Sequence, residues 1–285
     1  MATGRIPSPI YESVALSAKR RNKLIAFGWY GGKFSHLNWL LPLLPKCHHY
    51  CEPFAGSAAV LLNRDVSPVE TYNDIDGEVA NFFRVLRDHR NELVEAIGLT
   101  PFSRQEFSLA VSKTSDSIPD IEKARRFFVR ARQARTGLAQ TASLGRWANC
   151  KNTSRAGMSG TVSRWLGSIE SLPEIALRLL RVQIENRPAI EVIKLYDAAE
   201  TLFYCDPPYV HSTRGDSKAY AFEMTNEGHR ELAKVLGRAN GKVAVSGYRS
   251  DPMDTLYNGW NCIEARPKQC HSIKKMRQEA VWTNY

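Results

Sequence analysis

Short apolar runs alternate with amphipathic helical patterns along most of the chain, which is typical of α/β proteins with a largely parallel sheet. Strands are expected where apolar residues cluster, and helices where they recur at helical spacing. The expected strands end at Cys51-Glu52 or span 69–73, 182–184, 202–205, 243–245, 260–265 and 280–285. The expected helices begin at Ser57 or span 78–88, 189–196 and 227–239. The last two strands suit a terminal antiparallel hairpin.

The middle of the chain, residues 91–180, follows a different pattern. It is mainly helical and rich in arginine, and over 136–163 it loses periodicity and becomes rich in Gly, Ser, Thr and Asn. Such a stretch is typical of a loop-bearing insertion. We therefore predict one α/β domain formed by 23–90 and 181–285, an inserted helical domain over 91–180, and a basic N-terminal tail over 1–22.

The composition adds a basic balance to this picture. The 285 residues include 39 lysines and arginines and 29 aspartates and glutamates, which gives a formal net charge of +10. Such a balance suits a polyanionic partner, although net charge also serves solubility alone. No stretch approaches the roughly 20 apolar residues of a membrane span, and the N-terminus lacks the apolar core of a secretory signal. We therefore predict a cytoplasmic protein without a membrane partner; its oligomeric state stays open.

The cysteines and histidines do not form a metal-binding pattern. Cys47 and Cys51 flank His48 and His49, but no second ligand pair follows at zinc spacing. No metal is therefore expected. In a reducing compartment, most of the six cysteines are expected to be buried thiols.

The segment Tyr204-Cys-Asp-Pro-Pro-Tyr209 is the strongest candidate for chemistry. An apolar strand delivers Asp206 to its carboxyl end, where open α/β sheets bind ligands. Asp206 and the carbonyl of Pro207 can accept the two N–H groups of an exocyclic amine, and Tyr209 can stack on a flat base. Two acceptors on one nitrogen orient its lone pair toward an electrophile. With Pro208 fixing the turn, the catalytic candidates are Asp206, Pro207, Pro208 and Tyr209.

Three further segments are candidates for a ligand site. Glu52-Pro-Phe-Ala-Gly-Ser57 lies at a strand-to-helix turn, where small residues let a ligand approach, although the G-x-G-x-x-G spacing of dinucleotide sites is absent. Asp74 follows the next strand, where an acid can bind ribose hydroxyls or cap a helix. Trp29-Tyr-Gly-Gly-Lys33 offers two glycines and a cation, which suits either a ligand site or a surface turn.

The chain resembles the Dam-like DNA N6-adenine methyltransferases in four motifs that occur in the family's order. They are Trp29-Tyr-Gly-Gly-Lys33, Glu52-Pro-Phe-Ala-Gly56, Asn73-Asp-Ile-Asp76 and Asp206-Pro-Pro-Tyr209, and the segment 277–285 is similar to the family's closing strand. A cofactor segment, an insertion and then a catalytic segment look like the alpha arrangement, whose insertion is the target-recognition domain. The resemblance implies a Rossmann-like methyltransferase fold, with S-adenosylmethionine as donor and no metal. The implied acceptor is the N6 amine of a flipped adenine in double-stranded DNA.

The resemblance also implies residue roles. Tyr30 and Lys33 would lie near the methionine end of the donor, and Asp74 would bind its ribose. The expected cofactor-binding residues are Trp29, Tyr30, Gly31, Lys33, Glu52, Pro53, Phe54, Gly56, Asp74, Asn186 and Asp206. Asn186 is included as a candidate near the cofactor or the adenine, although Arg187 follows it where relatives often carry an acid. Ala58 stands where family members often carry a second glycine.

Other acceptors remain as alternatives: adenine in RNA, another planar amine in cytosine or glutamine, or nucleic acid bound without catalysis. Glutamine methyltransferases usually have Asn at the position of Asp206, and cytosine-N4 enzymes usually have Ser, so Asp206 favours adenine. A non-catalytic module would not need an intact cofactor turn. Cys205 precedes the acid on an apolar strand, which argues against the nucleophile of carbon-5 cytosine enzymes.

The insertion supplies the candidates for DNA contact. A row of arginines at helical spacing suits either a phosphate backbone or a solvated helix face: Arg125, Arg126, Arg130, Arg132 and Arg135. The loop 136–163 is the candidate reader of bases, because Arg and Asn side chains recognise base edges. Its candidates are Arg146, Asn152 and Arg155, with Trp147 as an aromatic that can fill the gap left by a flipped base. The sequence does not reveal the target.

Overall fold

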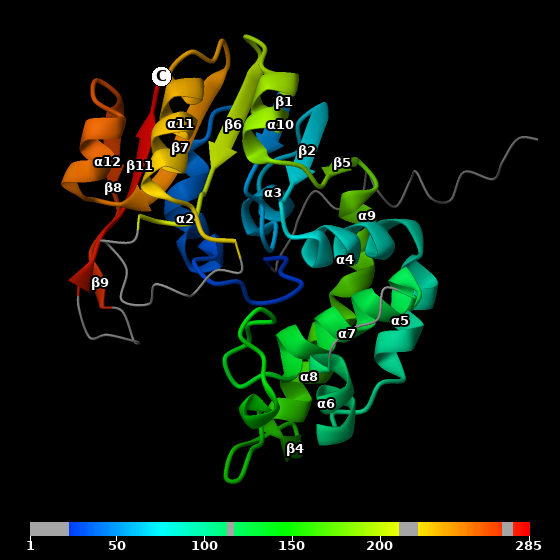
Figure 1. Ribbon diagram of the computed structural model, residues 1–285. Helices are drawn as coiled ribbons and strands as arrows, with labels where there is room; N and C mark the ends of the chain where they lie inside the picture. Colours follow the sequence, from blue (N-terminus) through cyan, green and yellow to red (C-terminus); the bar gives the residue numbers. More distant parts are fainter. Residues whose placement is uncertain (1–22, 113–116, 211–221, 270–275) are drawn as a thin grey trace, which may run out of the picture.

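The computed structural model describes residues 23–112, 117–210, 222–269 and 276–285, so the tail expected over 1–22 lies outside these ranges. Figure 1 shows two lobes: a sheet flanked by helices and, beneath it, a group of helices with a small hairpin. The expected fold class is confirmed, because the sheet is mostly parallel and ends in antiparallel strands.

One seven-stranded sheet forms the upper lobe, in the order β5-β2-β1-β6-β7-β11-β8. Its strands are β1 (His49–Glu52), β2 (Val69–Asn73), β5 (Val182–Glu185), β6 (Thr201–Cys205), β7 (Lys242–Tyr248), β8 (Asn261–Glu264) and β11 (Glu279–Thr283). The first five in spatial order are parallel, whereas β11 runs antiparallel to both β7 and β8. The chain winds outward from β1 to β5 and then returns to β6 on the other side of β1. That reversal creates the crevice where such sheets bind ligands.

Helices cover both faces of this sheet. On one face lie α2 (Leu37–Leu40), α3 (Ala59–Asn63) and α4 (Gly77–Asp88), and on the other α10 (Ala189–Tyr196), α11 (Asn226–Leu236) and α12 (Asp251–Leu256). A hydrophobic core lies on each face of the sheet. Successive side chains of β6 point to opposite faces, so Leu202 and Tyr204 join one core and Phe203 and Cys205 join the other. The central strands are therefore apolar on both sides.

The lower lobe shares its core with the sheet. It contains α5 (Arg90–Gly98), α6 (Arg104–Val111), α7 (Asp120–Gln133), α8 (Gly160–Glu170), α9 (Leu172–Leu179) and the hairpin of β3 (Ser154–Arg155) and β4 (Met158–Ser159). Phe82 of α4 stacks on Phe128 of α7 with ring centroids 5.6 Å apart. Glu70 of β2 forms a buried ion pair with Arg178 of α9, with an Nη2–Oε1 distance of 2.7 Å.

Outside this lobe, two short strands, β9 (Lys268–Gln269) and β10 (Met276–Arg277), pair in an antiparallel manner.

Two expected helix bounds and one expectation about cysteines are corrected. The helix expected from Ser57 begins at Ala59, because Gly56 and Ala58 adopt left-handed backbone angles that no helix contains. The helix expected over 227–239 ends at Leu236, where Gly237 caps it. Of the five cysteines in the described ranges, all free, only Cys51 and Cys205 are buried, so the expectation that most are buried is wrong.

Candidate active site

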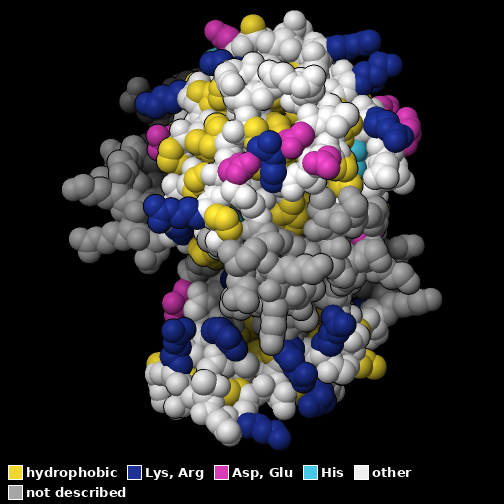
Figure 2. Space-filling model, turned by 90° about the vertical axis from the view of Figure 1, so that its left-hand side faces the viewer, with side chains coloured by type: hydrophobic (Ala, Val, Ile, Leu, Met, Phe, Trp, Pro, Cys, Tyr) yellow, Lys and Arg dark blue, Asp and Glu magenta, His cyan; other side chains and the backbone are white. Residues whose placement is uncertain are grey.

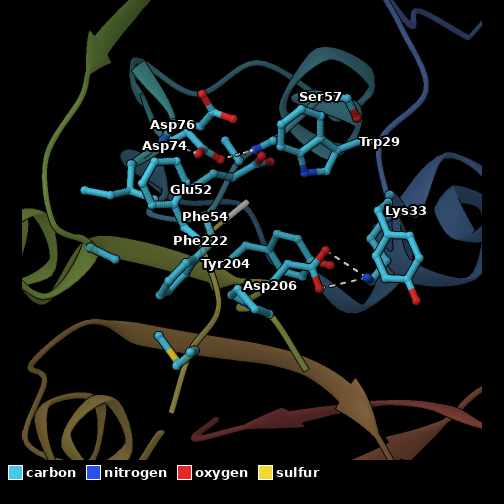
Figure 3. Close-up of a pocket in the computed structure, with 18 of the residues that line it drawn as sticks. Trp29, Lys33, Glu52, Phe54, Ser57, Asp74, Asp76, Tyr204, Asp206 and Phe222 are labelled. Atoms are coloured by element: carbon cyan, nitrogen blue, oxygen red, sulfur yellow. Dashed lines mark hydrogen bonds and ion pairs between the residues drawn. The ribbon is translucent and has the colours of Figure 1, made fainter. Parts of the chain in front are cut away.

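A cavity of about 450 Å³ opens at the carboxyl ends of β1, β2 and β6, at the switch point of the sheet. Residues from all four family-like motifs line it, as Figure 3 shows for ten of its residues. The expected site residues that line it are Trp29, Tyr30, Lys33, Glu52, Phe54, Gly56, Asp74, Asp206 and Pro208. The structure therefore brings together segments that are far apart in the sequence.

The turn after β1 is shaped by a close contact with an aromatic ring. Gly56 has φ +49°, and a Cβ at this position would lie 2.5 Å from the indole Nε1 of Trp29. No larger residue fits there, because the side chain would enter the ring and strain the backbone. Ala58 also adopts a left-handed conformation, with φ +55°. A glycine, which family members often carry at this position, would adopt that conformation without penalty. The alanine of this chain therefore strains the backbone.

Asp74 lies at the end of β2 and braces this turn. Its carboxylate accepts the backbone N–H of Gly56 at 2.8 Å and that of Asp76 at 2.9 Å. Burial raises the pKa of Asp74 to about 6, although both hydrogen bonds oppose the shift. The cap of α4 is Asp76, which accepts from the N–H of Glu78 at 3.0 Å. Asp74 is therefore not the helix cap, and its carboxylate faces the cavity (Figure 3).

Glu52 places a second buried carboxyl group at the cavity wall. Only 2% of the residue is exposed, and the hydroxyl of Tyr50 donates to its Oε1 at 2.6 Å. Burial raises the pKa of Glu52 to about 8, although this hydrogen bond opposes the shift. A carboxyl group held protonated at neutral pH ionises readily when a cation arrives beside it.

Asp206 is paired with Lys33, which projects from the turn Lys33–His36 (Figure 3). The ammonium Nζ lies 2.7 Å from Oδ1 and 2.8 Å from Oδ2 of Asp206. Burial lowers the pKa of Lys33, but the carboxylates of Asp206 and Glu279 outweigh burial, so the net pKa is raised. Burial raises the pKa of Asp206, although Lys33 opposes the shift. The acceptor predicted to hold an amine is thus already occupied by an ammonium group.

Five expected residues lie behind the cavity wall or beside it. The carbonyl of Gly31 accepts from Lys33 Nζ at 2.7 Å, and the carbonyl of Pro53 accepts from Asn73 Nδ2 at 2.8 Å. Asn186 lines an adjacent cavity instead, and its Nδ2 donates to the main-chain carbonyl of Asp74 at 2.7 Å. Pro207 is buried.

Tyr209 is also buried, with its ring edge-on to Tyr248 at a centroid distance of 4.7 Å. The ammonium of Lys33 lies 4.9 Å from the centroid of the Tyr209 ring. This arrangement does not leave the ring open for the stacking predicted from the sequence. A base that stacks there has to displace Lys33.

Several residues that build the site carried no predicted role. Tyr204 lines the cavity, and its place two residues before Asp206 on the same strand face is a signal that would have found it. Asn73 joins three strand ends by hydrogen bonds to Pro53 and to the backbone of Arg187. Glu279 lies within reach of Lys33, and only the pairing of β11 brings it there.

Arg125 and Arg126, the first two arginines of the row, form ion pairs with glutamates of the same chain. Arg125 donates to Glu106 at 2.8 Å and to Glu122 at 2.7 Å, and Arg126 donates to Glu122 at 2.7 Å. Both guanidinium groups are half-buried. These residues form an ion-pair network between α6 and α7, so both guanidinium groups are paired with carboxylates in this structure.

The remainder of the row divides between buried and exposed positions. Arg130 is buried, with one bond to the carbonyl of Ala110 and an ion pair with Glu78. Burial lowers the pKa of Arg132 to about 10, and its guanidinium lies over the Phe128 ring. Arg135 is exposed. Only the last of these three fits the expected phosphate contact.

The loop expected to read bases is largely open to solvent. Arg146, Asn152 and Arg155 are exposed, and Asn152 and Arg155 lie in or beside the β3–β4 hairpin. Trp147 is packed instead, with its ring 5.4 Å from that of Phe102. Trp147 is therefore not presented as the aromatic that fills a gap in DNA.

Neither a metal cluster nor a membrane span is found in the part of the chain that the structure describes. His, Cys, Asp and Glu side chains do not gather there in groups of three or more that could hold a metal ion. Within the same ranges, every helix is too short or too polar to cross a bilayer.

The comparisons with known proteins agree with this geometry. A model of the D12 class N6 adenine-specific DNA methyltransferases matches residues 29–278, which is most of the chain. The chain belongs to this family. It is therefore a DNA N6-adenine methyltransferase, and the matched residues include the helical lower lobe and every strand of the sheet except β11.

Two curated relatives match over nearly the whole chain. The type II methyltransferase M1.LlaDCHI of Lactococcus lactis subsp. cremoris is 25% identical over 288 aligned positions, which cover 90% of this chain and 94% of the relative. The type II methyltransferase M.MjaIII of Methanocaldococcus jannaschii is 23% identical over 280 positions, which cover 86% and 92%. Both relatives are named as type II methyltransferases, in keeping with the family.

Proposed function

We propose that the cavity at the switch point binds S-adenosylmethionine and that Asp206 receives the amine of an adenine in double-stranded DNA. The observation that carries this proposal is the meeting of Lys33, Glu52, Asp74 and Asp206 around one cavity at the strand ends. Its volume of about 450 Å³ lies within the usual range for small-molecule sites, roughly 300–1,000 Å³.

The residues present fit this donor. Asp74 has lone pairs to spare beside its two backbone hydrogen bonds and can accept ribose hydroxyls. Phe54, Pro188 and Ile190 supply apolar and aromatic wall against which an adenine ring can pack. Glu52 offers a carboxyl group that can neutralise the positive charge of the donor. When bound, S-adenosylmethionine supplies a methyl group on a positively charged sulfur.

The chain's own residues hold and polarise the acceptor. A carboxylate oxygen of Asp206 and the carbonyl of Pro207 accept the two N–H groups of the amine, which directs its lone pair away from the ring plane. Positive charge develops on that nitrogen as the new bond forms, and the carboxylate of Asp206 stabilises it. Lys33 has to leave Asp206 before the amine can bind.

The insertion supplies the proposed DNA contacts. A groove of about 400 Å³ lies beside Trp29, which also lines the cofactor cavity, and its walls include Arg135 and Arg164. Both arginines are exposed. In the view of Figure 2, lysine and arginine side chains gather over the lower lobe. We assign phosphate contact to Arg135 and Arg164, and base reading to Arg146, Asn152 and Arg155.

Calorimetry with S-adenosylhomocysteine tests the cofactor assignment. The parent protein is expected to bind one equivalent, and Asp74→Ala is expected to weaken binding by about 10- to 100-fold, because a charge-assisted hydrogen bond is worth about 1.5–3 kcal/mol. Glu227→Ala, at an exposed position on α11, is the matched control and is expected to leave the affinity unchanged. An unchanged dissociation constant for Asp74→Ala would remove the residue from the cofactor site.

A further inference from the structure

Glu279 is the first residue of β11, the antiparallel strand of the sheet. Because β11 runs against β7, its first residue lies beside Tyr248, the last residue of β7. Glu279 thus reaches the same edge of the sheet as the carboxyl ends of the parallel strands. Only 7% of the residue is exposed. A buried carboxylate at this edge requires partners, and those partners belong to the reacting site.

One oxygen of Glu279 contacts two residues of that site. The hydroxyl of Tyr209 donates to Oε1 at 2.8 Å, and Lys33 Nζ lies 3.4 Å from the same oxygen. Oε2 is buried and has no hydrogen-bond partner among the described residues. The carboxylate therefore holds the aromatic residue of the Asp206-Pro-Pro-Tyr209 turn, and it has an unused acceptor beside a buried ammonium.

The charges around Lys33 do not balance. One ammonium faces two carboxylates, Asp206 at 2.7 Å and Glu279 at 3.4 Å. Lys33 donates to Oδ2 of Asp206, lies 2.7 Å from its Oδ1, and covers one side of the Tyr209 ring, so it crowds the two places that a flipped adenine requires. If the amine takes Asp206, the ammonium needs another carboxylate at short range, because an unpaired buried charge is costly. Glu279 is the nearest one, at 3.4 Å.

We propose that Glu279 is a positioning residue for the acceptor amine, which it serves by holding the Tyr209 hydroxyl and by receiving the Lys33 ammonium when Asp206 turns to the substrate. This inference rests on the proposed function of Asp206. It concerns which of two carboxylates, Asp206 or Glu279, pairs with the Lys33 ammonium. Glu279 contacts neither the donor cavity nor, in this arrangement, the base.

Glu279→Gln separates the two contacts. The amide oxygen of glutamine can still accept from the Tyr209 hydroxyl, but it cannot neutralise Lys33. Lys33 is then expected to stay on Asp206 and to compete with the amine. Single-turnover methyl transfer at saturating donor is expected to slow by about 10- to 100-fold, the range for loss of a charge-assisted contact. The affinity for S-adenosylhomocysteine is expected to change by less than about twofold, because the donor cavity is untouched.

The conservative variant and a double variant complete the experiment. Glu279→Asp keeps the charge and is expected to recover at least about tenfold of the rate lost in Glu279→Gln. In a Lys33→Met background, Glu279→Gln is expected to have little further effect, since the ammonium that it serves is gone. Equal rates for the Asp and Gln variants, or additive losses in the double variant, would overturn the proposal.

Parent activity separates this inference from the proposed function. A parent protein that does not methylate DNA contradicts the assigned reaction, whereas an active parent with a fully active Glu279→Gln variant contradicts only the role of Glu279. If Glu279→Gln loses donor binding through misfolding, Tyr209→Phe decides. It removes the hydroxyl that donates to Glu279 and that also faces Asp206. Slower transfer with unchanged donor affinity supports a positioning role for this hydroxyl, while an unaltered rate overturns the proposal.

Discussion

Replacing Glu52 by glutamine is expected to stabilise the protein at alkaline pH while weakening donor binding. Folding raises the pKa of Glu52 from 4.5 to about 8 through burial. A carboxyl group whose pKa is raised by folding favours the folded state in its protonated form. The stability that protonated Glu52 gives the folded state is therefore fully present below about pH 4.5, and it is lost as pH rises toward about 8. Glutamine is uncharged at every pH, so the variant lacks this loss.

The magnitude follows from the interval between the two pKa values. At about 1.4 kcal/mol per pH unit, the interval from 4.5 to about 8 corresponds to about 5 kcal/mol, and about 3 kcal/mol of it is already lost at pH 7. Such a loss is a large fraction of the stability of an ordinary domain, about 5–15 kcal/mol. The side chain is therefore costly in the free protein, in keeping with a group kept for a cationic ligand.

Urea unfolding followed by tryptophan fluorescence at pH 5, 7 and 8.5 measures this effect. The parent and Glu52→Gln are expected to have similar unfolding free energies at pH 5, with the variant more stable at pH 8.5 by several kcal/mol. Glu227→Gln, at an exposed position, is the control and is expected to follow the parent at every pH. If the difference between the parent and Glu52→Gln does not grow with pH, Glu52 ionises freely in the folded protein, and the reasoning is refuted.

Three further changes test other parts of the account. Asp206→Ala is expected to abolish methyl transfer to DNA and to leave S-adenosylhomocysteine binding largely intact, and substantial activity in the folded variant would reassign the reacting site. Ala58→Gly is expected to raise the unfolding free energy by about 1 kcal/mol, because the left-handed backbone at φ +55° disfavours a Cβ; lower stability on chemical denaturation would show that the alanine methyl packs favourably. Changing both Arg135 and Arg164 to alanine is expected to reduce the slope of log K for DNA against log salt by about two, at about 0.9 per phosphate contact, whereas Arg125→Ala leaves the slope unchanged and lowers stability. Equal slopes in fluorescence anisotropy titrations of the parent and the double variant would remove the groove from the DNA interface.

The sheet and the cavity could be predicted because their signals are local. β2 and α10 follow the expected bounds, since strands buried on both faces and amphipathic helices have patterns readable over a few residues. Asp74 and Asp206 end such strands, so sequence alone places them at the ligand edge. Their convergence with Lys33 follows from the parallel order of the strands.

The contacts that escaped prediction depend on distant pairing. Lys33 and Asp206 are 173 positions apart, and no local pattern reports that the first occupies the acceptor of the second. Glu279 enters the site only because β11 runs antiparallel to β7. The spacing of the arginines in α7 was evident, but spacing does not reveal that Glu106 approaches Arg125 from a neighbouring helix. The same reason explains why Trp147 is packed against Phe102 and not free.

The most direct test is methyl transfer by the purified protein, with identification of the product. The protein is incubated with labelled S-adenosylmethionine in three parallel reactions. The first contains plasmid DNA, the second RNA of the same sequence, and the third protein. The DNA is then digested to nucleosides and separated by chromatography. We expect the label in N6-methyladenine from double-stranded DNA, with none for the Asp206→Ala variant. Label in cytosine, RNA or protein in place of DNA adenine, or an Asp206→Ala variant as active as the parent, would contradict the account.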